Sequence, residues 1–85
     1  MLKVTVHAKG ANVQTSAFKE HVSYEARKSK YLLRVEVSSS NSDEIKIVLT
    51  GDSSRINSFI SWLKSASKGA SKVKSVRTVS TVGVR

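Results

Sequence analysis

The chain has no cysteine, no proline, few aromatic residues and few acidic ones. The lack of cysteine excludes a disulfide scaffold, a thiolate zinc site and a thiol nucleophile. The longest apolar runs, Tyr31-Leu32-Leu33 and Ile47-Val48-Leu49, fall far short of the roughly 18 residues that a membrane-spanning helix needs. The first residues alternate like a strand and do not resemble a secretory signal, so we expect a cytoplasmic protein.

Chain length and the other residue types restrict the possibilities further. The 85 residues allow one small domain, which we expect to span residues 1–82, followed by a loose tail at 83–85. His7 and His21 have no other candidate ligand at metal-binding spacing, so we expect neither a metal site nor a cofactor. The motif G-x-S-x-G is absent, so a hydrolytic serine triad has no local support.

Alternating apolar and polar residues indicate the strands. Residues 2–7, 33–37 and 45–50 have the alternation of half-buried strands, and a valine-rich stretch at 73–82 predicts the last strand. We expect residues 9–12 to form a loop and the polar run at 38–43 to form a hairpin turn.

Two further segments have the spacing of amphipathic helices. Phe18, Val22 and Ala26 lie four residues apart in a first helix, which we expect from about Ser16 to Ser29. A second helix follows the stop and cap at residues 51–54, and its apolar residues have i, i+3, i+4, i+7 spacing: Ile56, Phe59, Ile60 and Leu63. The order of elements predicts an α+β sandwich of ferredoxin-like βαββαβ topology, with a four-stranded antiparallel sheet and two helices on one face.

One segment resembles the signature of a known family. Val13-Gln14-Thr15-Ser16-Ala17-Phe18-Lys19 resembles the acylphosphatase signature V-Q-G-V-G-F-R, and Phe59-Ile60-Ser61-Trp62-Leu63 with Gly69-Ala70 and Val73 is similar to that family's second helix and last strand. The resemblance implies an acylphosphatase-like fold from about Val4 to Val79. It also implies a phosphate site that needs no cofactor, and it places anion-binding residues at Thr15, Ser16, Ala17 and Lys19.

The signature is changed at its functional positions. Thr15 and Ala17 replace two loop glycines, and Lys19 replaces an arginine whose bidentate fork suits a phosphate. The family's water-orienting asparagine falls near Ser38 or Ser39. If the chain is an enzyme, the resemblance implies Lys19 and Ser39 as its catalytic residues. Because of these changes, our first hypothesis is a binding protein without catalytic activity.

The charge balance indicates a polyanionic partner. Fifteen lysines and arginines oppose six acids, a formal net charge of +9, and no acid follows Asp52. If both helix C-termini lie at one end of the sandwich, eight basic residues are expected to form one patch for nucleic acid or an acidic protein surface. These residues are Lys28, Lys30, Arg34, Lys64, Lys68, Lys72, Lys74 and Arg77.

Three functions stay open from the sequence. The first is binding of a nucleic-acid backbone, without base stacking because the exposed positions of the central strands contain no Phe or Tyr: Lys3, Thr5, His7, Lys46 and Val48. The second is a regulator or inhibitor, such as a viral or accessory protein, that docks on an acidic partner. The third is a degenerate acylphosphatase. Exposed strand edges also allow a dimer.

Overall fold

The computed structural model describes residues 1–28, 31–41, 43–69 and 71–83. The predicted βαββαβ order is confirmed, with one short strand added before the last. The elements are β1 (Leu2–Ala11), α1 (Ser16–Arg27), β2 (Arg34–Asn41), β3 (Glu44–Gly51), α2 (Ser53–Leu63), β4 (Ser67–Lys68) and β5 (Ser71–Gly83).

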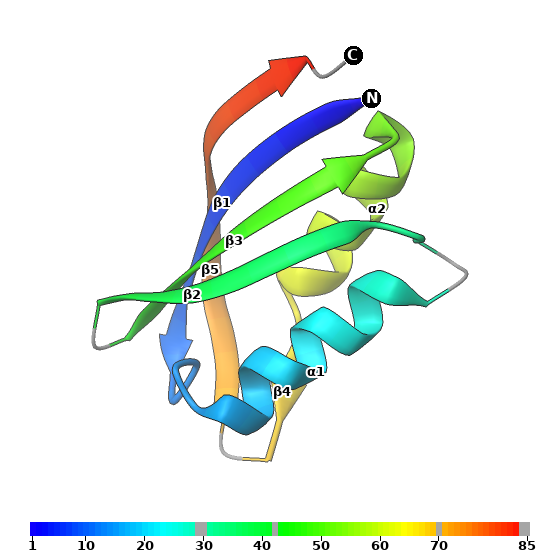
Figure 1. Cartoon of the computed structure of the whole chain (residues 1–85). Helices are drawn as coiled ribbons and strands as arrows, with labels where there is room; N and C mark the ends of the chain where they lie inside the picture. The colour runs from blue at the N-terminus through cyan, green and yellow to red at the C-terminus, as the bar shows by residue number, and fades with distance from the viewer. Residues whose placement is uncertain (29–30, 42, 70, 84–85) are drawn as a thin grey trace.

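The strands form one antiparallel sheet in the order β2-β3-β1-β5-β4. Four long strands make up most of the sheet, as predicted, and β4 adds only two residues beside the start of β5. Both helices lie on the same side of the sheet (Figure 1). The opposite face is therefore uncovered, and we call it the open face. Within the described residues, no helix has the length and apolar character needed to cross a membrane.

The core lies between the sheet and the two helices. Alternate residues of the central strands are buried on the helix side, as the period-2 pattern predicts: Val4, Val6 and Ala8 in β1, and Ile45, Ile47 and Leu49 in β3. The helices bury Phe18, Val22 and Ala26 from α1, and Ile56, Phe59 and Leu63 from α2. The helical spacing in the sequence thus identified the residues that hold the helices against the sheet.

The first strand is longer than the sequence indicated. Residues 9–11, expected in a loop, continue β1 and pair with β5 across a register shift at Lys9 and Gly10. Gly10 is required there because a Cβ atom would overlap the carbonyl oxygen of Lys72. Close backbone approach, which a sequence pattern does not reveal, therefore extends the strand.

Two other strand ends also differ from expectation. The polar run expected as a hairpin turn from residue 38 is still strand as far as Asn41. Gly83, expected in a loose tail, is the last residue of β5 and pairs with Leu2. Residues 84–85 of that tail lie outside the described part of the chain. In each case backbone pairing with a neighbouring strand prevails over the weak strand preference of Ser, Asn and Gly.

Candidate functional site

The loop that leads into α1 is fixed by hydrogen bonds to the start of β5. Asn12 has φ = 55°, a left-handed conformation that asparagine tolerates. The Ser71 hydroxyl, which is buried, donates to the Asn12 carbonyl oxygen at 2.6 Å and lies 3.3 Å from the Thr15 hydroxyl. The loop is thereby held against the sheet before the helix begins.

Thr15 is the N-cap of α1. Its hydroxyl oxygen accepts a hydrogen bond from the Phe18 amide at 3.2 Å, and its carbonyl oxygen accepts from the Lys19 amide at 3.0 Å. Among the described residues, the Ser16 and Ala17 amides have no hydrogen-bond acceptor, and the first turn contains no acidic residue. Free amides and the positive end of the helix dipole therefore meet at the start of α1, an arrangement that favours an anion.

Lys19 lies in this first turn and reaches the edge strand β2. Its Nζ atom donates to the Ser39 hydroxyl at 3.1 Å. Within the described part of the chain, no carboxylate pairs with Lys19, so its charge remains available to a ligand. The two residues that the resemblance implied as catalytic are thus in contact, although twenty positions separate them in the sequence.

Strand alternation separates the two candidate serines. Ser39 lies on the helix side of β2 with Val35 and Val37, whereas Ser38 lies opposite Lys46 on the open face. Asn41, two residues after Ser39, ends β2 and donates to Glu44 at 3.2 Å. Of the two serines, Ser39 is therefore the one that contacts the first turn of α1.

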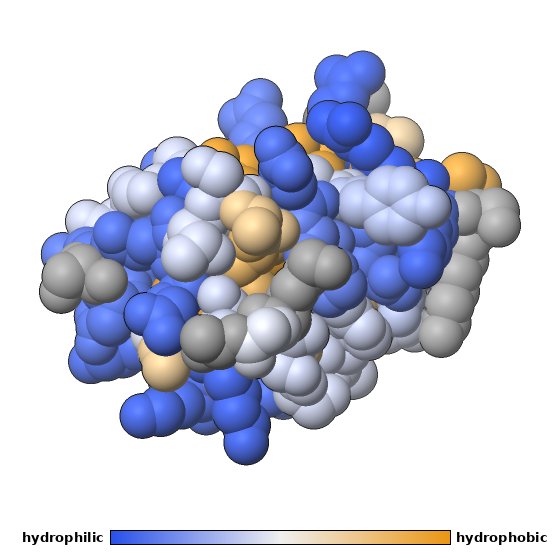
Figure 2. Space-filling view, turned by 90° about the horizontal axis from the view of Figure 1, so that it is seen from below, coloured by the Kyte–Doolittle hydropathy of each residue, from blue (hydrophilic) through white to orange (hydrophobic). Residues whose placement is uncertain are grey.

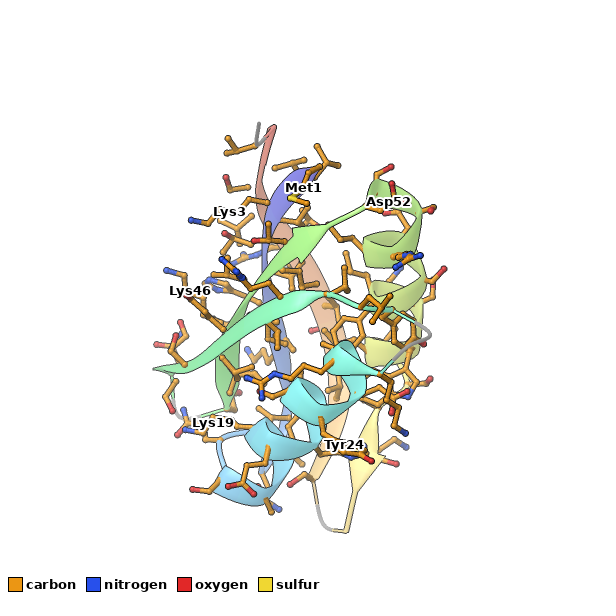
Figure 3. The ribbon with its side chains drawn as sticks, turned by 45° about the vertical axis from the view of Figure 1, so that its right-hand side comes forward. Met1, Lys3, Lys19, Tyr24, Lys46 and Asp52 are labelled. Atoms are coloured by element: carbon orange, nitrogen blue, oxygen red, sulfur yellow. The ribbon has the colours of Figure 1, made fainter. Side chains whose placement is uncertain are left out.

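A shallow groove of about 600 Å³ runs beside these residues along α1. It is lined by Ser16, Lys19, Glu20, Ser23, Tyr24, Arg27 and Val37. Figure 3 shows two of these side chains, Lys19 and Tyr24, at different points along α1. Sequence reasoning missed five of these residues. Four of them are helical and recur at three- and four-residue spacing next to the buried stripe: Glu20, Ser23, Tyr24 and Arg27. The fifth is Val37, an apolar residue of β2.

The end of the molecule that contains the start of α1 and the β4–β5 turn is predominantly hydrophilic. Only small hydrophobic areas show between the polar side chains when this end is seen from below (Figure 2). A charged ligand at the start of α1 would therefore be bound by polar groups at the surface and would not enter an apolar cavity.

Among the described residues, the cations predicted to form one basic patch do not gather at one end of the sandwich. The helices run in opposite directions, because α1 ends where β2 pairs with the Gly51 end of β3, whereas α2 ends where β5 pairs with the Ala11 end of β1. Lys28 and Arg34 therefore lie near one end of the sandwich, and Lys64, Lys68, Lys72 and Lys74 lie near the other. Lys30 is outside the described residues.

Lys28 is also occupied by local contacts. Its Nζ atom lies 3.0 Å from the Glu25 carboxylate and 5.1 Å from the centre of the Tyr24 ring. The hydrogen bond to Glu25, together with the charge of Glu25, raises the pKa of Lys28 above its ordinary value. Glu25 therefore partly neutralises the charge of Lys28 at the end of α1.

The open face brings four other cations together. Lys3 and Arg34 lie on either side of Thr50, and the three residues border a hollow of about 240 Å³ together with Glu36 and Val48. Arg77 and Lys46 flank His7 in the same way. Lys3 and Lys46 project from the sheet away from the helices (Figure 3). Of these four cations, Arg34 and Arg77 belong to the predicted patch, whereas Lys3 and Lys46 were expected only at exposed strand positions.

Glu44 partly neutralises this face. Its carboxylate lies 3.0 Å from Nδ1 of His7. Burial acts to raise the pKa of Glu44, but the hydrogen bond and charge of His7, the charge of Arg77 and the Asn41 hydrogen bond outweigh it and hold the pKa below its ordinary value.

Neither histidine belongs to a metal cluster within the described residues. His7 pairs with Glu44, and the His21 ring lies between Phe18 and Trp62, with ring centres 6.3 Å and 5.4 Å away. Trp62 stacks on Phe59 at 5.2 Å and is half-buried against the core. It therefore belongs to the rim of the core and is not a free stacking platform.

Comparisons with known proteins agree with the geometry. The acylphosphatase family model matches residues 4–82. Among solved structures, the chain is similar to the crystal structure of acylphosphatase from Bacillus subtilis, with a TM-score of 0.81 and 26% sequence identity over 100% of this chain and 89% of that one. Among curated protein sequences, none matches this chain.

Proposed function

Because the chain belongs to the acylphosphatase family, we propose that it binds acyl phosphates at the start of α1 and hydrolyses them there. The contact between Lys19 and Ser39, at 3.1 Å, carries this proposal. It brings the two residues at the family's functional positions beside the free amides of the helix start. Family membership also implies that hydrolysis needs no metal or cofactor.

Each group has a defined task in the proposed reaction. The Ser16 and Ala17 amides and the Lys19 ammonium bind the phosphate oxygens, and they stabilise the negative charge on the phosphoryl group during transfer. The Ser39 hydroxyl holds the attacking water. Water attacks phosphorus, the bond between phosphorus and the acyl oxygen breaks, and the products are a carboxylate and inorganic phosphate.

The replaced glycines are compatible with the loop. Thr15 has φ = −66°, so its position does not require the backbone freedom of glycine. Its hydroxyl instead caps α1, a task that glycine performs without a side-chain hydrogen bond. The replacement of arginine by Lys19 has a larger effect, because an ammonium group lacks the two parallel N–H donors of a guanidinium group. We therefore infer a slow enzyme.

Hydrolysis of acetyl phosphate tests the proposal. We expect the chain to hydrolyse it faster than buffer alone. Loss of one charged hydrogen bond in Lys19→Ala should slow the reaction by at least about tenfold. Lys19→Arg should exceed the wild-type rate because it restores the bidentate contact.

Lys64→Ala is the matched control, since Lys64 is an exposed lysine at the C-terminal end of α2. The variant should hydrolyse acetyl phosphate at the wild-type rate. A folded wild-type chain with no rate above buffer would overturn the proposal.

The four cations of the open face support a second candidate function, binding of a nucleic-acid backbone. Lys3, Arg34, Lys46 and Arg77 share one exposed face on which the described residues include no Phe, Tyr or Trp, so contacts would go to phosphates and depend steeply on salt. Fluorescence anisotropy of labelled single- and double-stranded nucleic acid, at several salt concentrations, measures this.

The variant Lys3→Gln with Lys46→Gln should weaken binding and reduce the salt slope, whereas Lys64→Gln with Lys72→Gln should change both less. Absence of binding at low salt would contradict nucleic acid as the ligand. It would leave an acidic protein surface as the partner for this face.

A further inference from the structure

The groove beside Lys19 continues along the whole of α1. Its lining begins at Ser16 in the first turn and reaches Arg27, the last residue of the helix. The positions of Lys19 and Arg27 in the helix set their Cα atoms about 12 Å apart along its axis. A volume of about 600 Å³ is typical of sites that hold ligands much larger than acetyl phosphate.

The other wall of the groove is β2, which lies beside α1 and runs in the opposite direction (Figure 1). Lys19 contacts Ser39 at one end of this pair. At the other end the Leu33 amide, directly before β2, donates to the Ala26 carbonyl oxygen at 2.9 Å. Val37 lines the groove on the same side of β2 as Ser39 and lies between these two ends. The groove therefore has a cation near each end and an apolar residue between them.

The charge of Arg27 is not neutralised by the described part of the chain. Glu25 is the nearest acid in the sequence, and it pairs with Lys28 at 3.0 Å. Arg27 is exposed, and within the described residues no carboxylate forms an ion pair with it. A guanidinium group binds a carboxylate through two parallel N–H donors. A carboxylate at this end of the groove would therefore find a suitable partner.

Glu20 determines how far from the phosphate a second negative charge is favoured. It also lines the groove, next to Lys19 in the sequence, and it has no ion pair among the described residues. A carboxylate close to the phosphate would meet the like charge of Glu20. About 10 Å further along the helix, a carboxylate would meet the opposite charge of Arg27.

On the basis of the proposed hydrolysis, we propose that the preferred substrates are acyl phosphates with a long acyl chain that ends in a carboxylate. The phosphate binds at the start of α1, the methylene groups lie along Val37 and Tyr24, and the terminal carboxylate pairs with Arg27. Water attacks phosphorus as described above, and the products are a dicarboxylate and inorganic phosphate. The monophosphate of suberic acid, an unbranched dicarboxylic acid, has about the length that separates Lys19 from Arg27.

The first experiment compares suberoyl monophosphate with octanoyl phosphate, which has the same chain length and no terminal carboxylate. At neutral pH and low salt, we expect KM to be about three- to fivefold lower for the suberoyl compound, a size typical of one exposed ion pair. The kcat values should be similar, because a contact remote from phosphorus binds the ground state and the transition state equally. Succinyl phosphate should have a higher KM than acetyl phosphate, because its short chain holds the carboxylate near Glu20.

Variants then assign the preference to single residues. Arg27→Gln should make the KM values of the suberoyl and octanoyl compounds equal and leave KM for acetyl phosphate unchanged, whereas Arg27→Lys should retain part of the preference. Arg55→Gln, which removes an exposed arginine from α2, is the matched control. Glu20→Gln should lower KM for succinyl phosphate. Arg27 also complements the dipole at the end of α1, but a loss of stability would affect all substrates alike and would not change the ratio of their KM values.

The results distinguish this inference from the proposed function. No hydrolysis of acetyl phosphate by the folded chain would overturn both. Hydrolysis of acetyl phosphate with equal KM values for the suberoyl and octanoyl compounds would overturn the inference alone. A preference for the suberoyl compound that Arg27→Gln leaves intact would do the same.

Discussion

At the scale of single residues, Val37 is the groove residue least suited to the proposed hydrolysis of a phosphate. It lines the groove with Lys19, yet its side chain can neither donate nor accept a hydrogen bond. We expect Val37→Asn to hold the attacking water and raise kcat for acetyl phosphate by about tenfold, a range typical of one added polar group in an active site. Val48→Asn, half-buried on the open face, is the control and should not change kcat.

At position 10 the fold requires glycine, because there is no room for a side chain. We expect Gly10→Ala to lower the free energy of unfolding by about 1–3 kcal/mol, because the new methyl group would push the β5 backbone at Lys72 away from β1. Urea denaturation measures this change. Gly83→Ala is the matched control, since no atom lies within 4 Å of its added Cβ, and it should leave the unfolding midpoint nearly unchanged.

Glu44 links stability to pH. Its pKa is lower in the folded chain than the ordinary value of 4.5, so it stabilises the fold above that pH and this contribution is lost as the pH falls through the folded-state pKa. We expect Glu44→Gln to be less stable than wild type at neutral pH, with the difference shrinking in acid. Melting temperatures across the acidic range test this. Glu36→Gln, on the same face and without an ion pair among the described residues, should show a smaller pH-dependent difference.

At the scale of elements, the start of α1 depends on a side chain where the family signature has glycine. We expect Thr15→Ala to lower the free energy of unfolding by about 1 kcal/mol, because the Phe18 amide loses its acceptor and Ser71 loses a neighbour. Thr15→Ser keeps the hydroxyl and should remain close to wild type. Equal stability of the alanine and serine variants in urea would contradict the role of the hydroxyl as a cap.

The elements also show how far a sequence alone specifies this fold. The buried stripe of each helix was predictable, because apolar spacing follows directly from helical geometry, and Phe18 and Phe59 lie in the core as expected. The ends of the strands were not predictable. Ser40 and Gly83 are in strands because a neighbouring backbone pairs with their segments, and that information lies elsewhere in the chain.

At the scale of the whole molecule, the arrangement of charge was the least predictable property. The sequence reveals an excess of cations but not their positions. The opposite directions of α1 and α2 separate residues such as Lys28 and Lys72, which had been expected in one patch, while the sheet register brings Lys3 and Arg34 together around Thr50. Lys19 and Ser39 were named together only through the family resemblance, because no spacing rule in the sequence relates a helix residue to a strand residue twenty positions away.

The position of β2 at the end of the sheet has a consequence for the lifetime of the candidate site. β2 pairs with β3 on one side only in the described sheet, so it opens with less free energy than the central strands β1 and β3. Such a local opening carries Ser39 away from Lys19 while the buried residues of β1 and β3 stay packed. Amide hydrogens of β2 should exchange with solvent earlier than those of β1. On warming, the proposed hydrolysis would therefore disappear from a population that is still folded.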